Sequence, residues 1–147
     1  MLIFTEWFGK KKLVIFLCCV HSWKKGRNKC YEYWPNENTE KIMDVSNDFT
    51  VTFEGIQNHT SDIINKCCKI RILKIKNLLK NEEREIIHYN MLSWPDFGTP
   101  VEEEYEVIED ILKIISKKEN DEKSKNKIIV HCSAGIGRTG TLIAIYN

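Results

Sequence analysis

The segment that most constrains this chain is a glycine-rich stretch, residues 131–140 (HCSAGIGRTG), set between a short apolar run and an apolar helical pattern. A strand that enters a glycine-rich turn and then opens a helix directs successive backbone N–H groups toward one point, at the positive end of the helix. Glycines at positions 135, 137 and 140 permit positive φ and let a ligand approach the backbone closely. The segment therefore predicts an anion-binding loop.

Two side chains give this loop a chemistry. Cys132 lies at the base of the predicted cradle, where the field of the N–H groups lowers the pKa of a thiol and stabilises its thiolate. Arg138 follows six positions later, and its planar guanidinium can grip two phosphate oxygens together, which a lysine cannot do. A thiolate that attacks phosphorus forms a cysteinyl-phosphate intermediate. A nucleotide-binding loop fits poorly, because the Lys and following Ser or Thr after its final glycine are missing.

The pattern of apolar residues predicts an α/β (α+β) domain with a twisted mixed β-sheet flanked by helices. Residues 67–77 alternate between apolar and polar side chains, and residues 85–92 do so less cleanly. We expect these two segments to pair as neighbours across a turn near Asn81. The predicted strands are residues 13–20, 30–34, 49–53, 67–77, 85–92 and 127–131, with loops at 36–48 and 119–127 and a helix over 139–146.

A further helix is predicted directly after residues 93–100 (SWPDFGTP), which hold two prolines and a glycine and cannot be regular structure. Acidic side chains follow Pro100, where they suit the positive end of a helix, and Lys117 and Lys118 suit its negative end. Apolar residues at helical spacing give this helix a buried face. They are Val107, Ile108, Ile111, Leu112 and Ile115.

Composition narrows the classes of partner and cofactor. With 22 basic and 21 acidic side chains the formal net charge is +1, so neither nucleic acid nor an anionic membrane is expected as a partner. The apolar run at 13–20 has only 8 residues, too short to cross a bilayer, and is interpreted as a buried strand of a soluble protein. His21, His59 and His88 lack ligand spacing and the six cysteines lack C-x-x-C spacing, so no metal or other cofactor is expected. A reduced, cytoplasmic protein fits better than a disulfide framework, because a disulfide would quench the thiolate.

Three segments together resemble the protein tyrosine phosphatase family. Residues 131–141 (HCSAGIGRTGT) resemble its signature loop, a pattern shared with dual-specificity phosphatases. Residues 94–96 (WPD) look like the movable loop that carries the family's general acid, although alone they would equally be a surface turn. Residues 26–35 (GRNKCYEYWP) are similar to a segment of the tyrosine-specific members, where Tyr33 and Trp34 are expected to pack in the core. The order and spacing of the three segments favour the tyrosine-specific branch.

The resemblance implies a role for each matched residue. Asp96 would protonate the leaving tyrosine, as a carboxylic acid can near neutral pH, and would later activate water. His131 would help to hold the thiolate, and Thr139 would donate a hydrogen bond to the sulfur. The phosphate would be bound by the rest of the loop, which comprises Ser133, Ala134, Gly135, Ile136, Gly137 and Arg138.

The expected function is that of an enzyme that removes phosphate from phosphotyrosine-containing proteins in signalling. Residues 1–147 are expected to form a partial catalytic domain, since no segment matches the family's N-terminal phosphotyrosine loop or its later glutamine loop. This leaves open an impaired protein that binds or traps phosphotyrosine, or an inert fragment. A composition rich in Lys, Ile and Asn also favours an AT-rich genome such as that of a bracovirus, and the compartment would then be the host-cell cytoplasm.

Overall fold

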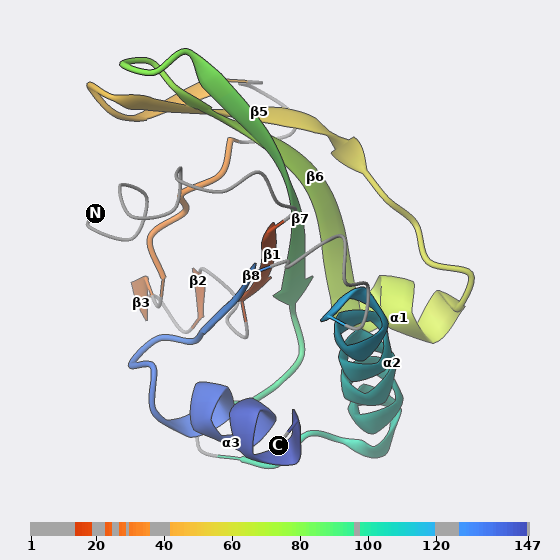
Figure 1. Cartoon of the computed structure of the whole chain (residues 1–147). Coiled ribbons are helices and arrows are strands. Elements are labelled where there is room, and N and C mark those ends of the chain that lie inside the picture. Colours follow the sequence, from red (N-terminus) through yellow and green to blue (C-terminus); the bar gives the residue numbers. More distant parts are fainter. Residues whose placement is uncertain are drawn as a thin grey trace.

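The structure, a computed structural model (Figure 1), describes residues 14–18, 23–24, 27–28, 30–35, 42–95, 98–119 and 127–146. Within these ranges the chain forms a mixed sheet in the order β4-β5-β6-β7-β1-β8, a two-stranded ribbon β2-β3, and three helices. The elements are β1 (Val14–Cys18), β2 (Trp23–Lys24), β3 (Arg27–Asn28), β4 (Ile42–Ser46), β5 (Phe49–Ile56), α1 (Asp62–Cys67), β6 (Cys68–Asn77), β7 (Glu82–Met91), α2 (Glu102–Glu119), β8 (Lys127–His131) and α3 (Gly137–Tyr146). The predicted fold class is confirmed.

The sheet has an antiparallel half and a parallel half. Strands β4 to β7 pair antiparallel in chain order, whereas β1 lies between β7 and β8 and pairs parallel with both. The predicted β6–β7 hairpin is confirmed, and Asn81 in its turn has a φ of 52°. Asparagine tolerates this left-handed conformation better than most residues do. The hairpin is the long curved pair of strands in Figure 1.

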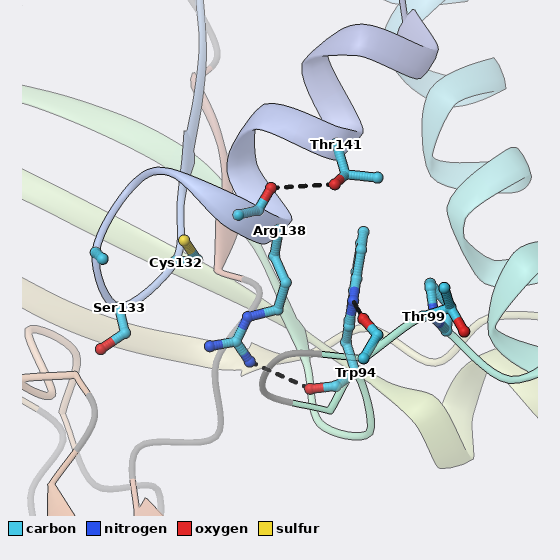
Figure 2. Close-up of a pocket in the computed structure, with 10 residues that line it drawn as sticks. Trp94, Thr99, Cys132, Ser133, Arg138 and Thr141 are labelled. Atoms are coloured by element: carbon cyan, nitrogen blue, oxygen red, sulfur yellow. Dashed lines mark hydrogen bonds between the residues drawn. The ribbon is translucent and has the colours of Figure 1, made fainter.

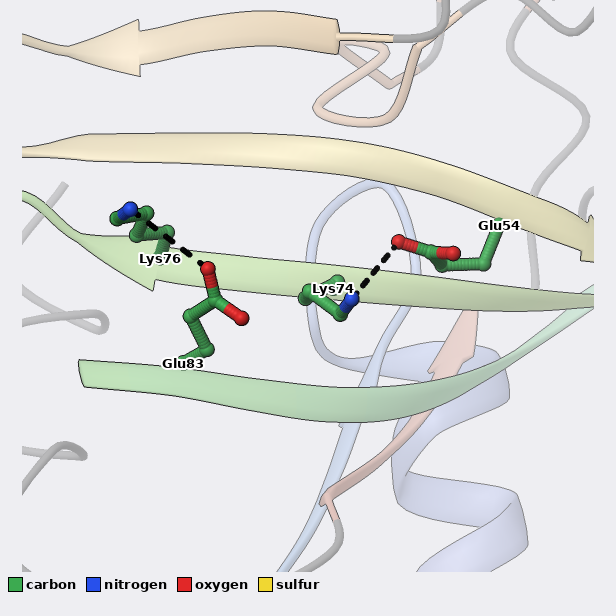
Figure 3. Close-up of polar contacts among 4 residues, drawn as sticks. All are labelled: Glu54, Lys74, Lys76 and Glu83. Carbon is green, nitrogen blue, oxygen red and sulfur yellow. Dashed lines mark ion pairs between the residues drawn. The ribbon is translucent and has the colours of Figure 1, made fainter.

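Ion pairs mark the outer face of the hairpin and its neighbour β5. Lys74 Nζ lies 3.2 Å from Glu54 Oε1, and Lys76 Nζ lies 3.7 Å from Glu83 Oε1 (Figure 3). These exposed pairs add little stability. The two lysines do indicate the register of β6, because Ile75 between them is buried on the opposite face of the sheet. A slip of one residue would move both lysines into the core.

The prediction of a loop over residues 36–48 is wrong for the part that the structure describes, because β4 occupies residues 42–46. Among the residues that the structure describes, strand β4 lies at one edge of the sheet and pairs with β5, with a register shift between Asp44 and Ser46. An edge strand needs few buried side chains, and Ile42 and Asp44 are exposed. Polar composition therefore did not distinguish this strand from a loop.

The predicted strand over residues 30–34 is also wrong, since the backbone there is irregular. In a strand, consecutive side chains point to opposite faces of the sheet. Here the rings of Tyr33 and Trp34 meet edge to face at 4.8 Å, and both pack against His88. The irregular backbone lets these two neighbouring rings pack on one side, and Pro35 could not donate to a strand ladder.

Helix α2 confirms the helix predicted after residue 100. Val107, Ile108 and Ile111 are at most 3% exposed, whereas the side chain of Ile115 lies outside the described residues. The first turn is capped by Glu104, whose Oε2 accepts a hydrogen bond of 2.9 Å from the Val101 N–H. Helix α1, which the sequence did not reveal, packs against α2 and the start of β6.

Candidate active site

The parallel half of the sheet brings two functional loops together. Strands β7, β1 and β8 run in the same direction, so their carboxyl ends lie at one edge of the sheet. Strand β7 leads there into the segment that begins at Trp94, and β8 leads into Cys132. Ligands of parallel sheets bind at this edge, outside the carboxyl ends of the strands. The topology thus explains why Trp94 and Cys132, which lie far apart in the sequence, line the same cavity.

The glycine-rich loop has the predicted order of strand, turn and helix. Gly135 has a φ of +72°, as the sequence suggested, and α3 begins at Gly137. Gly137 and Gly140, where the sequence permits positive φ, belong to α3, and neither has a positive φ. A Cβ atom at either glycine would meet nothing within 4 Å, so neither position requires glycine for space inside the chain. Their open surroundings instead leave the helix N-terminus accessible.

The pKa of the Cys132 thiol is lowered from its ordinary value. Burial of this residue, which is 8% exposed, acts to raise the pKa. Hydrogen bonds from the Thr139 hydroxyl and from the backbone N–H groups of Thr139 and Gly135, together with the Arg138 charge, outweigh that effect. Thr139 Oγ1 is buried and has no hydrogen-bond partner of ordinary geometry among the described residues, so no other acceptor competes with the sulfur for its proton. The loop therefore favours a thiolate.

The thiolate lies beside a cavity of about 430 Å³ (Figure 2). Arg138 extends from the first turn of α3 across this cavity, and its Nη1 donates a hydrogen bond of 3.1 Å to the Trp94 carbonyl. Of the predicted phosphate-binding residues, Ser133, Ala134, Gly137 and Arg138 line the cavity, and Gly135 and Ile136 complete the turn. The other lining residues are Trp94, Gly98, Thr99, Pro100, Cys132 and Thr141.

The segment after β7 is held by its own contacts. The Trp94 indole, 4% exposed, donates from Nε1 to the Gly98 carbonyl over 3.3 Å. A Cβ atom at position 98 would lie 2.9 Å from Pro95 Cγ, so this tight turn admits only glycine without a shift. Asp96, the predicted general acid, lies outside the described residues, whereas Trp94 and Gly98, two positions before and two positions after it, line the cavity.

His131 contacts the backbone of the nucleophile. Its Nδ1 lies 3.3 Å from the Cys132 carbonyl oxygen, and its Nε2 lies 2.6 Å from the hydroxyl of Tyr33. The Tyr33 hydroxyl oxygen also lies 3.3 Å from Nε2 of His88. The sequence predicted that Tyr33 packs in the core and that His88 is not a metal ligand, but it did not reveal that both side chains lie close to His131. The only available signal was the presence of Tyr33 in the 26–35 motif.

Two other properties bear on the kind of site. Among the residues that the structure describes, no group of three or more His, Cys, Asp or Glu side chains is arranged to hold a metal ion. The described helices also include none that is long and apolar enough to cross a membrane.

Comparison with known proteins agrees with this geometry. The family model described as "Protein-tyrosine phosphatase" matches residues 5–147. Tyrosine-protein phosphatase 2 of Dictyostelium discoideum is 37% identical over 122 residues, which cover 82% of this chain and 28% of that protein. Human tyrosine-protein phosphatase non-receptor type 9 is 31% identical over 147 residues, covering 92% of this chain and 23% of that protein. The chain therefore spans about a quarter of the length of these curated relatives.

A solved structure, described as the structural basis of the PTPN18 fingerprint on distinct HER2 tyrosine phosphorylation sites, has the same fold. It superposes with a TM-score of 0.69 at 23% identity, and the match covers 92% of this chain and 43% of that one. This likeness shows the fold alone, over most of the length of this chain.

Proposed function

The chain belongs to the protein-tyrosine phosphatase family, and from that premise we propose that it hydrolyses phosphotyrosine on proteins through a cysteinyl-phosphate intermediate. The observation that carries the proposal is the lowered pKa of the Cys132 thiol beside a cavity that Arg138 crosses. A thiolate at neutral pH is the nucleophile that such a reaction needs. The guanidinium and the N–H groups of the loop supply the positive charge that a phosphoryl group needs.

The first step transfers the phosphoryl group to sulfur. The Cys132 thiolate attacks phosphorus, an S–P bond forms, and the P–O bond to the tyrosine breaks. Asp96 gives its proton to the departing phenolic oxygen, so that neutral tyrosine leaves. Arg138 and the backbone N–H groups of residues 133–137 bind the remaining phosphoryl oxygens.

The second step releases phosphate. A water molecule attacks phosphorus, Asp96 takes one of its protons, and the S–P bond breaks. The electron pair returns to sulfur, where the Thr139 hydroxyl and the N–H groups that lower the pKa of Cys132 stabilise it. The residues that favour the thiolate in the resting protein therefore also make it a good leaving group.

The proposed substrates are phosphotyrosine-containing proteins, in keeping with the names of the relatives. The cytoplasm is part of the proposal, because a thiolate nucleophile requires a compartment that keeps cysteine reduced. Phosphatase activity in signalling would follow from these substrates.

A time course of phosphate release from a phosphotyrosyl peptide tests the proposal, with Cys132→Ser as the matched variant. We expect sustained release over many turnovers by the natural chain and none by the variant, which keeps the loop but lacks the thiol. No release, or a burst that stops at one phosphate per chain, would contradict the proposal. The single burst would instead identify a protein that traps phosphotyrosine or its phosphate.

A further inference from the structure

A buried histidine lies outside the cavity but is connected to the nucleophile. His88, on β7, is 0% exposed, and its Nε2 lies 3.3 Å from the Tyr33 hydroxyl. The same hydroxyl lies 2.6 Å from Nε2 of His131, whose Nδ1 lies 3.3 Å from the Cys132 carbonyl. We call this series of contacts, from His88 through Tyr33 and His131 to the Cys132 carbonyl, the histidine relay. Nothing in the chemistry described above uses its first member.

The direction of each hydrogen bond in the relay can be deduced from the carbonyl end. A carbonyl oxygen only accepts, so His131 Nδ1 must carry a proton to bond with Cys132. Burial lowers the pKa of His131, so near neutral pH its ring carries no second proton. His131 Nε2 is then an acceptor, and the Tyr33 hydroxyl donates to it across 2.6 Å.

The Tyr33 hydroxyl has one proton, which is committed to His131, so its oxygen can only accept from His88. His88 must therefore carry its proton on Nε2, and its Nδ1 is a bare acceptor. Nδ1 is buried and has no hydrogen-bond partner among the described residues. The opposite assignment would bury an unpaired N–H donor at that position, and orphaned buried N–H groups are the rarer and costlier case. The unpartnered, buried Nδ1 of His88 thus agrees with the hydrogen-bond directions that were deduced from the Cys132 carbonyl.

The surroundings of His88 keep it neutral. Its ring packs against the Trp34 ring at 4.6 Å, and the guanidinium of Arg71 from β6 lies 5.2 Å from the same indole. Burial first, then the Arg71 charge and the His131 ring, hold the pKa of His88 well below its ordinary value. Arg71 itself is 7% exposed and donates to the Asn90 side chain over 3.3 Å. His88 therefore stays neutral near pH 7 and donates a hydrogen bond from Nε2.

We propose that His88 is a positioning residue of the active site, which acts through Tyr33 and His131. Its Nε2–H fixes the Tyr33 hydroxyl as a donor to His131, and His131 then holds the Cys132 carbonyl and with it the start of the nucleophile loop. A donor to the Tyr33 oxygen also polarises the hydroxyl and strengthens its bond to His131. The role of Cys132 as nucleophile rests on the proposed function, but the relay itself can be tested on the thiol alone.

The first test is to determine the tautomers of the two histidines in the unmodified protein by long-range proton–nitrogen NMR. We expect His88 to carry its proton on Nε2 and His131 on Nδ1 at pH 7. A proton on Nδ1 of His88, or a doubly protonated His88 ring, would overturn the proposal. This test needs no variant and no catalytic turnover.

The second test measures the pH dependence of Cys132 alkylation by iodoacetamide, followed on the peptide that contains Cys132. His88→Leu removes the donor at similar volume, and His88→Gln restores one. We expect the midpoint to rise by about half a pH unit in His88→Leu, which corresponds to about a threefold loss of thiolate below the midpoint. The midpoint of His88→Gln should stay near that of the natural chain.

Ile86→Ala is the matched control, because Ile86 lies on the same strand, is 2% exposed and is not part of the relay. Its truncation loosens the core without removing a donor. An unchanged midpoint in His88→Leu would overturn the proposal, and so would equal shifts in His88→Leu, His88→Gln and Ile86→Ala. If the chain releases no phosphate but the midpoint still shifts as expected, the proposed function fails and the relay stands.

Discussion

The Nη1 atom of Arg138 lies 3.1 Å from the Trp94 carbonyl oxygen and donates a hydrogen bond to it. This bond joins the two loops of the site, which are 44 residues apart in sequence. A guanidinium has five N–H donors in a planar fork, so Arg138 can keep the loops together and still present donors to a phosphate. Binding of an anion and the position of the Trp94 segment are thus coupled through one side chain.

Arg138→Lys should separate charge from geometry at this position. A lysine keeps the positive charge but cannot bond two phosphate oxygens and the Trp94 carbonyl in one plane. We expect kcat for a phosphotyrosyl peptide to fall by about 10²- to 10³-fold, the usual effect of losing a transition-state donor. Steady-state kinetics checks this, and a lysine variant with unchanged kcat would contradict the proposed clamp.

Thr139→Ala should raise the pKa of the Cys132 thiol, because the Thr139 hydroxyl is among the groups that lower it. A hydrogen bond to a charged group contributes more than one between neutral groups, so we expect breakdown of the phosphoenzyme to slow by about 10- to 100-fold. Rapid-quench measurement would then detect accumulated cysteinyl phosphate. Thr139→Ser keeps the hydroxyl and serves as the control. Equal rates in the two variants would show that the hydroxyl is not involved.

Gly98→Ala should displace the segment that carries Asp96. The added Cβ would lie 2.9 Å from Pro95 Cγ, so the turn has to shift. Small misplacements of a catalytic group are costly, and we expect kcat to fall by about 10- to 100-fold while inorganic phosphate still inhibits at similar concentration. Gly55→Ala is the control, because a Cβ there meets nothing within 4 Å. A fully active Gly98→Ala variant would indicate that the turn tolerates the shift.

Local signals explain what could be predicted from the sequence. The strand, turn and helix around Cys132 follow one another within about twenty residues, and each has its own pattern of apolar residues or glycines. The β6–β7 hairpin likewise carries its alternation and its turn residue Asn81 in one continuous stretch. These elements form where neighbours in sequence are also neighbours in space.

What the sequence did not reveal depends on contacts between distant segments. Tyr33 and His88 are 55 residues apart, and only the fold places them in hydrogen-bond contact. Strand β4 has no apolar alternation that would distinguish it from a loop, since its structure comes from main-chain pairing with β5 at the sheet edge. In both cases the structure depends on which distant residue or strand a segment contacts, and the composition of the segment does not specify that contact.

Glu104→Ala should destabilise the fold through the start of α2. Glu104 is 1% exposed, and its Oε2 accepts the hydrogen bond from the Val101 N–H that caps the helix. Loss of such a cap lowers the free energy of unfolding by about 1 kcal/mol. The matched control is Glu103→Ala, because Glu103 is exposed on the same turn and should change stability by less than about 0.5 kcal/mol. Urea unfolding of both variants checks this, and equal losses would contradict the capping role.

The stability of the protein should fall as the pH drops below 6.5, and His88 should account for part of the loss. The pKa of His88 is held well below its ordinary value of 6.5 by burial, by the Arg71 charge and by the His131 ring. As the pH falls through 6.5, the unfolded chain binds a proton at this histidine that the folded chain does not. The contribution of His88 to the free energy of unfolding is therefore fully present above pH 6.5. It falls by up to about 1.4 kcal/mol per pH unit below pH 6.5, until the pH reaches the folded pKa.

Urea unfolding of the natural chain and of His88→Gln between pH 5 and pH 8 isolates this contribution. The variant lacks the titrating ring, so its stability should decline less steeply below pH 6.5, while other groups, His131 among them, act equally in both proteins. The difference in the free energy of unfolding between the two proteins should be constant above pH 6.5. Below pH 6.5 it should change with pH at the slope that corresponds to the uptake of about one proton on unfolding. If the two stability curves are parallel over the whole pH range, His88 takes up its proton as readily in the folded chain as in the unfolded one. His88 would then not be the neutral donor that the histidine relay requires.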